Sequence, residues 1–335
     1  MLSLYIILGI IAFYVVAGII GAIVLNQVMF CKHLKEVDNP CFLSFKDYEN
    51  NLDREEFSYQ IDKKIIIGGY IYVSKTKYDS SKEMIILSPG YGHTHLQYLL
   101  DINFLCNLGY KVLAYDHYGT GLSSGKTLKN LYFSKYVMEN LLNYIKEHNI
   151  NENKKVILYG HSWGGYTVVA SKKNDLVAKI ISRSGFNAPI KAINDAATRK
   201  NILLSYLNPF NYLFNLVAHG TKALTPCVKD LKKNNQNIPT LVIYAIDDLT
   251  VSNANSLAAN LRMNNLPNIY YIVTQDGGHN SLLSVEGQKY HKTIVKEYAQ
   301  LKTNEEKSSF ANKLDLVGHY KLNPVVTKSI IDFLS

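Results

Sequence analysis

The segment VILYGHSWGGYTVVA, from Val156 to Ala170, decides the fold. An apolar run rich in β-branched residues ends at Gly160, one serine follows, and a second apolar run begins after Gly164. Because β-branched residues favour strands, the pattern predicts a buried strand, a tight turn and a buried helix. Ser162 then has two interpretations. It is either an ordinary helix N-cap or a nucleophile presented on the turn, since GHSWG fits the pattern G-x-S-x-G.

Strand-like segments alternate with helical segments along most of the chain. EMIILSPG, KVLAYD, KVILYG, AKIISRSG, TLVIYAID and NIYYIVTQ are the strand-like ones, and helices are expected near 97–108, 129–148, 163–172, 254–264, 284–300 and 324–334. FSYQID and IIIGGYIYVS flank a lysine pair and predict a hairpin before them. The fold class is therefore α/β, with about eight strands in a mostly parallel sheet covered by helices and one antiparallel edge.

Charge and cysteine content limit which binding partners and which cellular compartment the sequence predicts. Lys and Arg number 36 against 27 Asp and Glu, which gives a formal net charge of +9 in 335 residues. A positive net charge favours binding to an anionic surface, such as nucleic acid or anionic lipid. Because the sequence has no basic run interleaved with aromatic residues, lipid is preferred and no nucleic-acid partner is predicted; a generally lysine-rich composition explains the charge equally well. The four cysteines form no C-x-x-C pair and are predicted as free thiols of a reducing compartment.

The amino-terminal segment is apolar throughout. Residues 2–25 are almost entirely apolar and residues 1–31 carry no charged side chain, which exceeds the roughly 20 residues that a helix needs to cross a bilayer. A signal peptide is the competing interpretation, but it expects a positive amino-terminal region and a small-residue cleavage site. We expect residues 1–31 to be a single-pass anchor in the cell membrane. The positive-inside rule places the following domain in the cytoplasm, because the flanking positive charges all follow the span, at Lys32, Lys35 and Lys46.

A nucleophilic serine needs a histidine base that a carboxylate orients. TLVIYAIDDLTV ends a strand at Asp247 and Asp248, and NIYYIVTQDGGHN turns through two glycines into His279. The order Ser, Asp, His is the one expected for a serine on such a turn. With these motifs in place, residues of about 60–335 resemble the α/β-hydrolases. They are most similar to bacterial membrane-anchored hydrolases that resemble monoglyceride lipases and the serine aminopeptidase-like group.

The resemblance implies a role for each residue of a triad. In the family the acid is the fourth residue of a G-x-x-D turn; here Ala245 replaces the glycine and the fourth residue is Asp248. Asp248 is therefore preferred over Asp247, whose alternative role is turn or helix capping. His279 matches the family's last histidine. The competing histidines are His161, which suits packing or substrate contact inside the turn, and His291 and His319, which lie outside it.

The same resemblance implies an oxyanion hole made of two backbone N–H groups. The residue after the nucleophile, Trp163, supplies one, and Tyr91 in LSPGYGHTH supplies the other, with Pro89 where the family's H-G-x-G loop usually has histidine. YDHYGTGLSSGK resembles a structural D-x-R-G-x-G-x-S loop, with Tyr118 in place of the arginine. A nucleotide-binding loop is the rival, but it lacks P-loop spacing. The nearby His93 and His95 are expected to stabilise their loop, and we predict no cofactor and no metal.

The domain boundaries follow from these segments. We expect a linker over 32–56, a hydrolase domain over 57–335, and within it a helical cap insertion over about 187–237. The cap contains ILLSYLNPFNYLFNLV, whose apolar side chains either contact an acyl chain or pack on the domain. The charged insertion 301–322 has no predicted role.

The combined prediction is a membrane-anchored serine hydrolase that cleaves a carboxylic ester with a lipid-like or other apolar acyl group. Its catalytic residues would be Ser162, Asp248 and His279, and it would act through an acyl-enzyme intermediate. A peptidase or thioesterase would use the same triad, because the chemistry of attack is shared. A non-catalytic, membrane-tethered binding protein on this fold is the third possibility.

Overall fold

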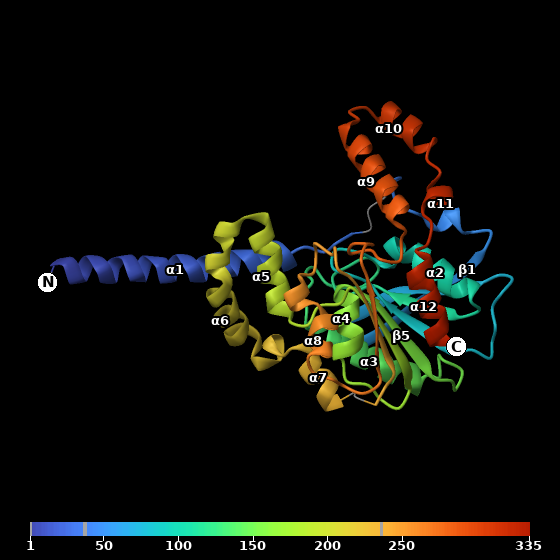
Figure 1. Ribbon diagram of the computed structural model, residues 1–335, viewed down its shortest axis with the longest axis horizontal. Helices are drawn as coiled ribbons and strands as arrows, with labels where there is room; N and C mark the ends of the chain where they lie inside the picture. Colours follow the sequence, from blue (N-terminus) through green and yellow to red (C-terminus); the bar gives the residue numbers. More distant parts are fainter. Residues whose placement is uncertain (1, 36–38, 235–236) are drawn as a thin grey trace.

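A computed structural model describes residues 2–35, 39–234 and 237–335 and centres on one mixed sheet (Figure 1). Its eight strands have the order β1-β2-β4-β3-β5-β6-β7-β8. Their bounds are β1 Leu52–Asp62, β2 Ile65–Ser74, β3 Met84–Ser88, β4 Lys111–Tyr115, β5 Val156–His161, β6 Val177–Arg183, β7 Thr240–Ala245 and β8 Ile269–Thr274. β2 pairs antiparallel with both β1 and β4, and the remaining pairs are parallel. The predicted mostly parallel sheet with an antiparallel edge is confirmed.

Helices cover both faces of this sheet. In β5, Val156 and Leu158 face one apolar cluster while Ile157 and Tyr159 face another, as expected for a central strand buried on both sides. The first cluster lies under α3 (Phe133–Glu147), α4 (Trp163–Ala170) and α8 (Leu257–Arg262), and the second under α2 (Leu99–Asn107), α9 (Val285–Gln300) and α12 (Pro324–Leu334). Short 3-10 turns are η1 (Phe45–Asp47), η2 (His95–Tyr98) and η5 (Asn253–Asn255).

A long helix, α1 (Leu2–Phe30), projects from the body of the molecule and carries the amino terminus away from it (Figure 1). Within the stretch Ser3–Phe30, an 18-residue window has a mean hydropathy of 2.7 and is mostly exposed. Its length and composition fit a membrane span, and they also fit a signal sequence.

Further helices lie between β6 and β7, in the region where the sequence predicts a cap. They are α5 (Pro189–Lys200), η3 (Ile202–Leu207), α6 (Asn208–His219), η4 (Thr221–Leu224) and α7 (Cys227–Asn234). We call residues 189–224 the cap. η3 and α6 stand beside α1, and α5 packs on both of them, whereas α7 packs on the body next to α4 (Figure 1). Residues 235 and 236, at the end of the predicted insertion, lie outside the described residues.

The predicted linker 32–56 and the charged insertion 301–322 both contain structure that the sequence did not predict. The predicted linker 32–56 contains the start of β1 at Leu52, and its side chains Cys41, Leu43 and Tyr48 are buried in the core. These apolar residues are part of the core under the sheet, so the folded body of the molecule includes residues before 57. The charged insertion 301–322 forms α10 (Asn304–Ala311) and α11 (Leu316–His319), which extend from the body together with α9 (Figure 1).

Candidate active site

Ser162 stands alone on a tight turn between β5 and α4. Its backbone has φ 56° and ψ −113°, a conformation that costs a non-glycine residue about 1–3 kcal/mol. The flanking glycines make the turn possible. A Cβ atom at Gly160 would lie 2.2 Å from the carbonyl oxygen of Gly164, and one at Gly164 would lie 1.9 Å from that of Ser88. The turn has no room for side chains at these positions, so Ser162 presents its hydroxyl at the carboxyl end of the central strand.

Asp248 and His279 meet at the same end of the sheet, after β7 and β8. His279 Nδ1 donates a hydrogen bond of 2.8 Å to Asp248 Oδ2. The other oxygen, Oδ1, accepts the backbone N–H groups of Thr250 at 2.7 Å and Val251 at 3.0 Å. The Asp248 side chain is fully buried. Both oxygens of this carboxylate thus accept hydrogen bonds, and the bond to Nδ1 leaves the His279 Nε2 atom available as a base.

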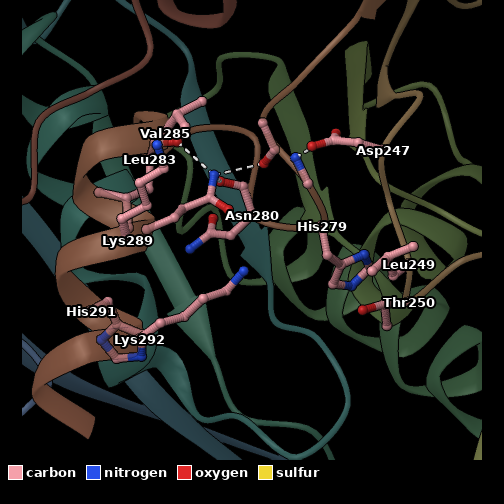
Figure 2. Close-up of a pocket in the computed structure, with 13 residues that line it drawn as sticks. Asp247, Leu249, Thr250, His279, Asn280, Leu283, Val285, Lys289, His291 and Lys292 are labelled. Carbon is pink, nitrogen blue, oxygen red and sulfur yellow. Dashed lines mark hydrogen bonds between the residues drawn. The ribbon is translucent and has the colours of Figure 1, made fainter. Parts of the chain in front are cut away.

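Asp247 has a different position. Its Oδ1 atom accepts the backbone N–H of Gly278 at 2.8 Å, as the dashed line in Figure 2 shows. Gly277 and Gly278 have φ values of 115° and 54°, so the turn before His279 depends on glycine. Asp247 therefore holds the turn that carries the histidine, while Asp248 holds the imidazole itself.

The loop Pro89–Tyr91 lies beside Ser162. A Cβ atom at Gly90 would be 3.4 Å from Ser162 Cβ. The Gly90 N–H donates to Tyr98 Oη at 2.7 Å, and the next amide along the chain is that of Tyr91. Trp163 is the first residue of α4, so its N–H has no acceptor inside the helix. The two amides that the resemblance implied for an oxyanion hole are therefore carried by the loop beside Ser162 and by the first residue of the helix that follows it.

His161 links these parts, a role that the sequence did not reveal. Tyr98 Oη donates to His161 Nδ1 at 2.8 Å, and His161 Nε2 donates to the backbone carbonyl of His279 at 2.9 Å. Burial, with the nearby Arg183 charge, holds the pKa of His161 well below its usual value. The neutral ring accepts on one side and donates on the other. It ties the His279 loop to the turn of Ser162, although no hydrogen bond joins Ser162 to His279 directly among the described residues.

A second histidine, His117, supports the loop before Tyr91. Its ring stacks on Trp163 with centroids 4.0 Å apart, and Nε2 donates to the Pro89 carbonyl at 2.9 Å. Burial lowers the pKa of His117 to about 4, so the ring is neutral at pH 7. His95 also supports this region through Nδ1, which donates to Asp116 Oδ1 at 3.0 Å. Pro89 therefore keeps its position by its carbonyl, without the family's histidine.

Tyr118 and Ala245 are the remaining departures from the family pattern. The Tyr118 ring packs edge-on against Phe133, with centroids 5.5 Å apart, and lies under Lys129. It therefore belongs to a structural loop, as expected. Ala245 is fully buried at the end of β7, and its carbonyl accepts the Asp248 N–H at 3.1 Å. A methyl group is accommodated where the family has glycine.

The end of α1 also touches the site. Tyr91 Oη donates to the Met29 carbonyl at 2.5 Å, and the Tyr91 ring packs edge-on against Phe30 with centroids 6.2 Å apart. The Phe30 carbonyl accepts the Leu128 N–H at 2.9 Å. The apolar amino-terminal helix thus contacts the residue that carries one of the two candidate oxyanion amides. Nothing in the local sequence pattern indicates this contact, because it joins segments about sixty residues apart.

A cavity of about 590 Å³ is lined by His279, by the loop after β7 and by α9. Figure 2 shows Leu249 and Thr250 beside the imidazole, and Lys292 extending from α9 toward it. His279, the candidate base, is therefore among the residues that line this cavity.

Comparison with known proteins agrees with this architecture. Residues 79–209 match the model of the family described as serine aminopeptidase, S33. A proline iminopeptidase from Saccharolobus solfataricus is 29% identical over 150 residues, which cover 44% of this chain and 45% of that protein. The chain therefore spans less than half the length of this curated relative.

Solved structures show the same fold at low sequence identity. An esterase from Pyrococcus furiosus has a TM-score of 0.59 and 16% identity, over 82% of this chain and 99% of the esterase. An acylaminoacyl peptidase from Pyrococcus horikoshii has a TM-score of 0.50 and 13% identity, over 83% of this chain and 45% of the peptidase. The sheet order, the serine on its strand-to-helix turn and these structural similarities show that the chain has an α/β-hydrolase fold.

Proposed function

We propose that the protein is a serine hydrolase that cleaves a carboxylic ester through an acyl-enzyme intermediate. One observation carries the proposal: Asp248 accepts the Nδ1 proton of His279 while two backbone amides hold its other oxygen. This arrangement fixes the imidazole tautomer in which Nε2 has a free lone pair, the form that a general base requires. The partial match to the serine aminopeptidase family and the fold shared with a solved esterase support an enzyme.

The reaction has two displacements. The Ser162 oxygen attacks the substrate carbonyl carbon as His279 Nε2 takes the hydroxyl proton, and Asp248 stabilises the imidazolium. The Tyr91 and Trp163 N–H groups donate to the oxygen that becomes negative. The intermediate collapses, His279 returns the proton to the leaving alcohol, and the acyl group stays on the serine. Water, activated by the same histidine, then releases the carboxylic acid.

An apolar acyl group is the substrate class that we propose. The apolar α1 helix ends against Tyr91, and the cap beside it exposes large apolar side chains. Peptidase or thioesterase activity is the second candidate, favoured by the partial match to the serine aminopeptidase family. A non-catalytic binding protein would have no need for the hydrogen-bonded Asp248–His279 pair.

We also propose that α1 is a retained, single-pass membrane anchor and that the hydrolase domain faces the cytoplasm. The contacts of Met29 and Phe30 with Tyr91 and Leu128 support retention, because cleavage after the helix would remove them. Lysines that follow the helix support the orientation. Carbonate extraction of cell membranes, with protease protection of a carboxyl-terminal tag, would test both statements.

A fluorophosphonate probe tests the nucleophile. We expect the full-length protein to be labelled, Ser162→Ala to lose labelling and turnover, and Ser80→Ala, a control at an exposed serine, to keep both. Labelling of Ser162→Ala at the wild-type level would contradict the assignment, and an unlabelled wild type would favour a binding protein. A panel of p-nitrophenyl esters of increasing chain length, aminoacyl p-nitroanilides and acyl thioesters then distinguishes esterase from peptidase and thioesterase.

A further inference from the structure

The cap helix α6 has the opposite polarity to that of a helix on a water-facing surface. Its buried positions include Asn211 and Asn215, which are 0% and 1% exposed. Its exposed positions include Leu213 and Val217, at 51% and 79%. Helices on soluble proteins bury their apolar side chains and expose their polar ones. This inversion points to an apolar surrounding medium for the outer face of α6.

The apolar exposure continues from α6 into the preceding turn. We call the following residues the outer cap face: Ile202, Leu203, Tyr206, Tyr212, Leu213, Leu216 and Val217, all of which are exposed. A contiguous apolar patch of this kind marks a contact with another protein or a membrane. Lys200 and Lys222 lie just beyond its two ends in the chain, where basic side chains suit anionic lipid headgroups.

The cap packs directly against α1. A Cβ atom at Gly18 would lie 2.3 Å from the Phe210 ring, and one at Gly21 would lie 2.5 Å from the Leu207 side chain. Tyr14 adds an edge-on ring contact with Phe210 at 5.6 Å. Small residues that admit large ones in this way are typical of helix pairs inside membranes.

Amide hydrogen bonds join the same helices internally. Asn26 Nδ2 donates to Asn211 Oδ1 at 2.7 Å, and Asn211 Nδ2 donates to Asn194 Oδ1 at 2.6 Å. Asn215 Nδ2 also donates to Asn211 Oδ1, at 2.9 Å. All four side chains are buried, so α1, α5 and α6 share one polar cluster shielded from the outside. Polar side chains of membrane helices pair across helices for the same reason.

The exposed face of α1 indicates how far along the helix the bilayer extends. At the level of the cap contacts, α1 still exposes Val16, Ile20 and Val24, at 55%, 56% and 50%. A helix that left the lipid before reaching the cap would place these side chains in water. The apolar layer around α1 therefore extends alongside the cap, as the side-by-side position of α1 and α6 in Figure 1 also suggests.

We propose that the outer cap face is immersed in the acyl layer of the bilayer, so that α1 and the cap form one membrane-embedded unit. This inference rests on the proposed anchoring of α1 and goes beyond it. A second protein would be the other occupant of such a patch; the bilayer is favoured because the outer cap face is continuous with a helix that already has the composition of a membrane span.

Depth-dependent fluorescence quenching tests the proposal. The full chain with Cys31→Ser, which removes the exposed thiol and leaves three buried ones, carries one new cysteine labelled with an environment-sensitive fluorophore. The probed positions are Leu213→Cys and Val217→Cys on the cap, Ile11→Cys on α1, and the control Met263→Cys. Met263 is 76% exposed, close to the value for Val217, but lies at the end of α8. The protein is reconstituted in phosphatidylcholine nanodiscs with brominated acyl chains.

We expect the two cap labels to be quenched severalfold more than the Met263 label and to approach the Ile11 label. Quenching at Ile11 with none at either cap position would overturn the inference and leave the anchor intact. No quenching at any position would overturn both the anchor and the inference. Quenching of the Met263 label equal to that of the cap labels would also overturn the inference, because the whole protein surface would then adsorb to the bilayer. Cap labels that shift to the blue without quenching would show that a second copy of the chain covers this face, and would overturn the inference.

Discussion

Replacing Asp248 by asparagine tests the acid–base pair at a single atom. In the protein, Oδ1 accepts two backbone N–H groups, from Thr250 and Val251, and Oδ2 accepts His279 Nδ1. The asparagine oxygen will remain at the Oδ1 position, since an NH2 group there would face two donors. Its NH2 group then faces Nδ1, which must become an acceptor. The imidazole proton moves to Nε2, and the base that Ser162 needs is lost.

The size of the effect follows from this change of tautomer. A triad whose acid is replaced by its amide loses about 10⁴ in kcat when the geometry is kept. That factor corresponds to about 5.4 kcal/mol at about 1.36 kcal/mol per factor of ten. We expect KM to change little, because Asp248 is buried behind the imidazole and has no route to the substrate. The folded state should persist, since the two backbone hydrogen bonds are kept.

The assay is p-nitrophenol release from purified full-length protein, with active sites counted by the fluorophosphonate probe. Asp247→Asn is the matched control: its amide oxygen can still accept the Gly278 N–H, so we expect less than about a tenfold loss. The reasoning is refuted if Asp248→Asn keeps more than about a tenth of wild-type kcat, or if Asp247→Asn loses as much as Asp248→Asn.

Three further outcomes are expected. Gly164→Ala places a Cβ atom 1.9 Å from the Ser88 carbonyl oxygen and should destabilise the fold by at least about 1–3 kcal/mol in urea unfolding, whereas Gly9→Ala, with nothing within 4 Å, should not. Tyr98→Phe removes the hydroxyl that holds the Pro89–Tyr91 loop; kcat should fall more than KM rises, and an unchanged kcat would contradict the role of that hydroxyl. Burial lowers the pKa of His117 to about 4, so its contribution to the free energy of unfolding is complete above about pH 6.5. Below that pH the unfolded state binds a proton that the folded state does not, and about 3 kcal/mol of the free energy of unfolding is lost by pH 4. The free energy of unfolding of His117→Gln should lack this pH dependence.

The sheet and the positions of the candidate residues were predictable because their signals are local. The run Val156–Ala170 shows its strand, turn and helix in adjacent residues, and the strands that carry Asp248 and His279 end in turns. In a parallel sheet the carboxyl ends of such strands meet at one edge. Local pattern and topology together were therefore enough to bring distant residues into one site.

The contacts that support the candidate site were not predictable, because each joins segments that lie far apart in the sequence and that no local hydrophobic pattern relates. His161 bonds to Tyr98 and to the His279 carbonyl, and His117 stacks on Trp163; single histidines in a sequence carry no sign of such partners. The polarity of α6 was hidden for a different reason. Asn211 and Asn215 face inward because Asn26 on α1 and Asn194 on α5 supply hydrogen-bond partners.

The contact between Tyr91 and the end of α1 has a practical consequence for anyone who prepares this protein. Removing the apolar helix is the usual way to obtain a soluble enzyme from an anchored one. Here the cut would take away the Met29 carbonyl that holds the Tyr91 hydroxyl and the Phe30 ring that packs on it. A shortened, soluble form would then show weak turnover even with a perfect substrate, and a screen on that form would underestimate the activity of the whole protein.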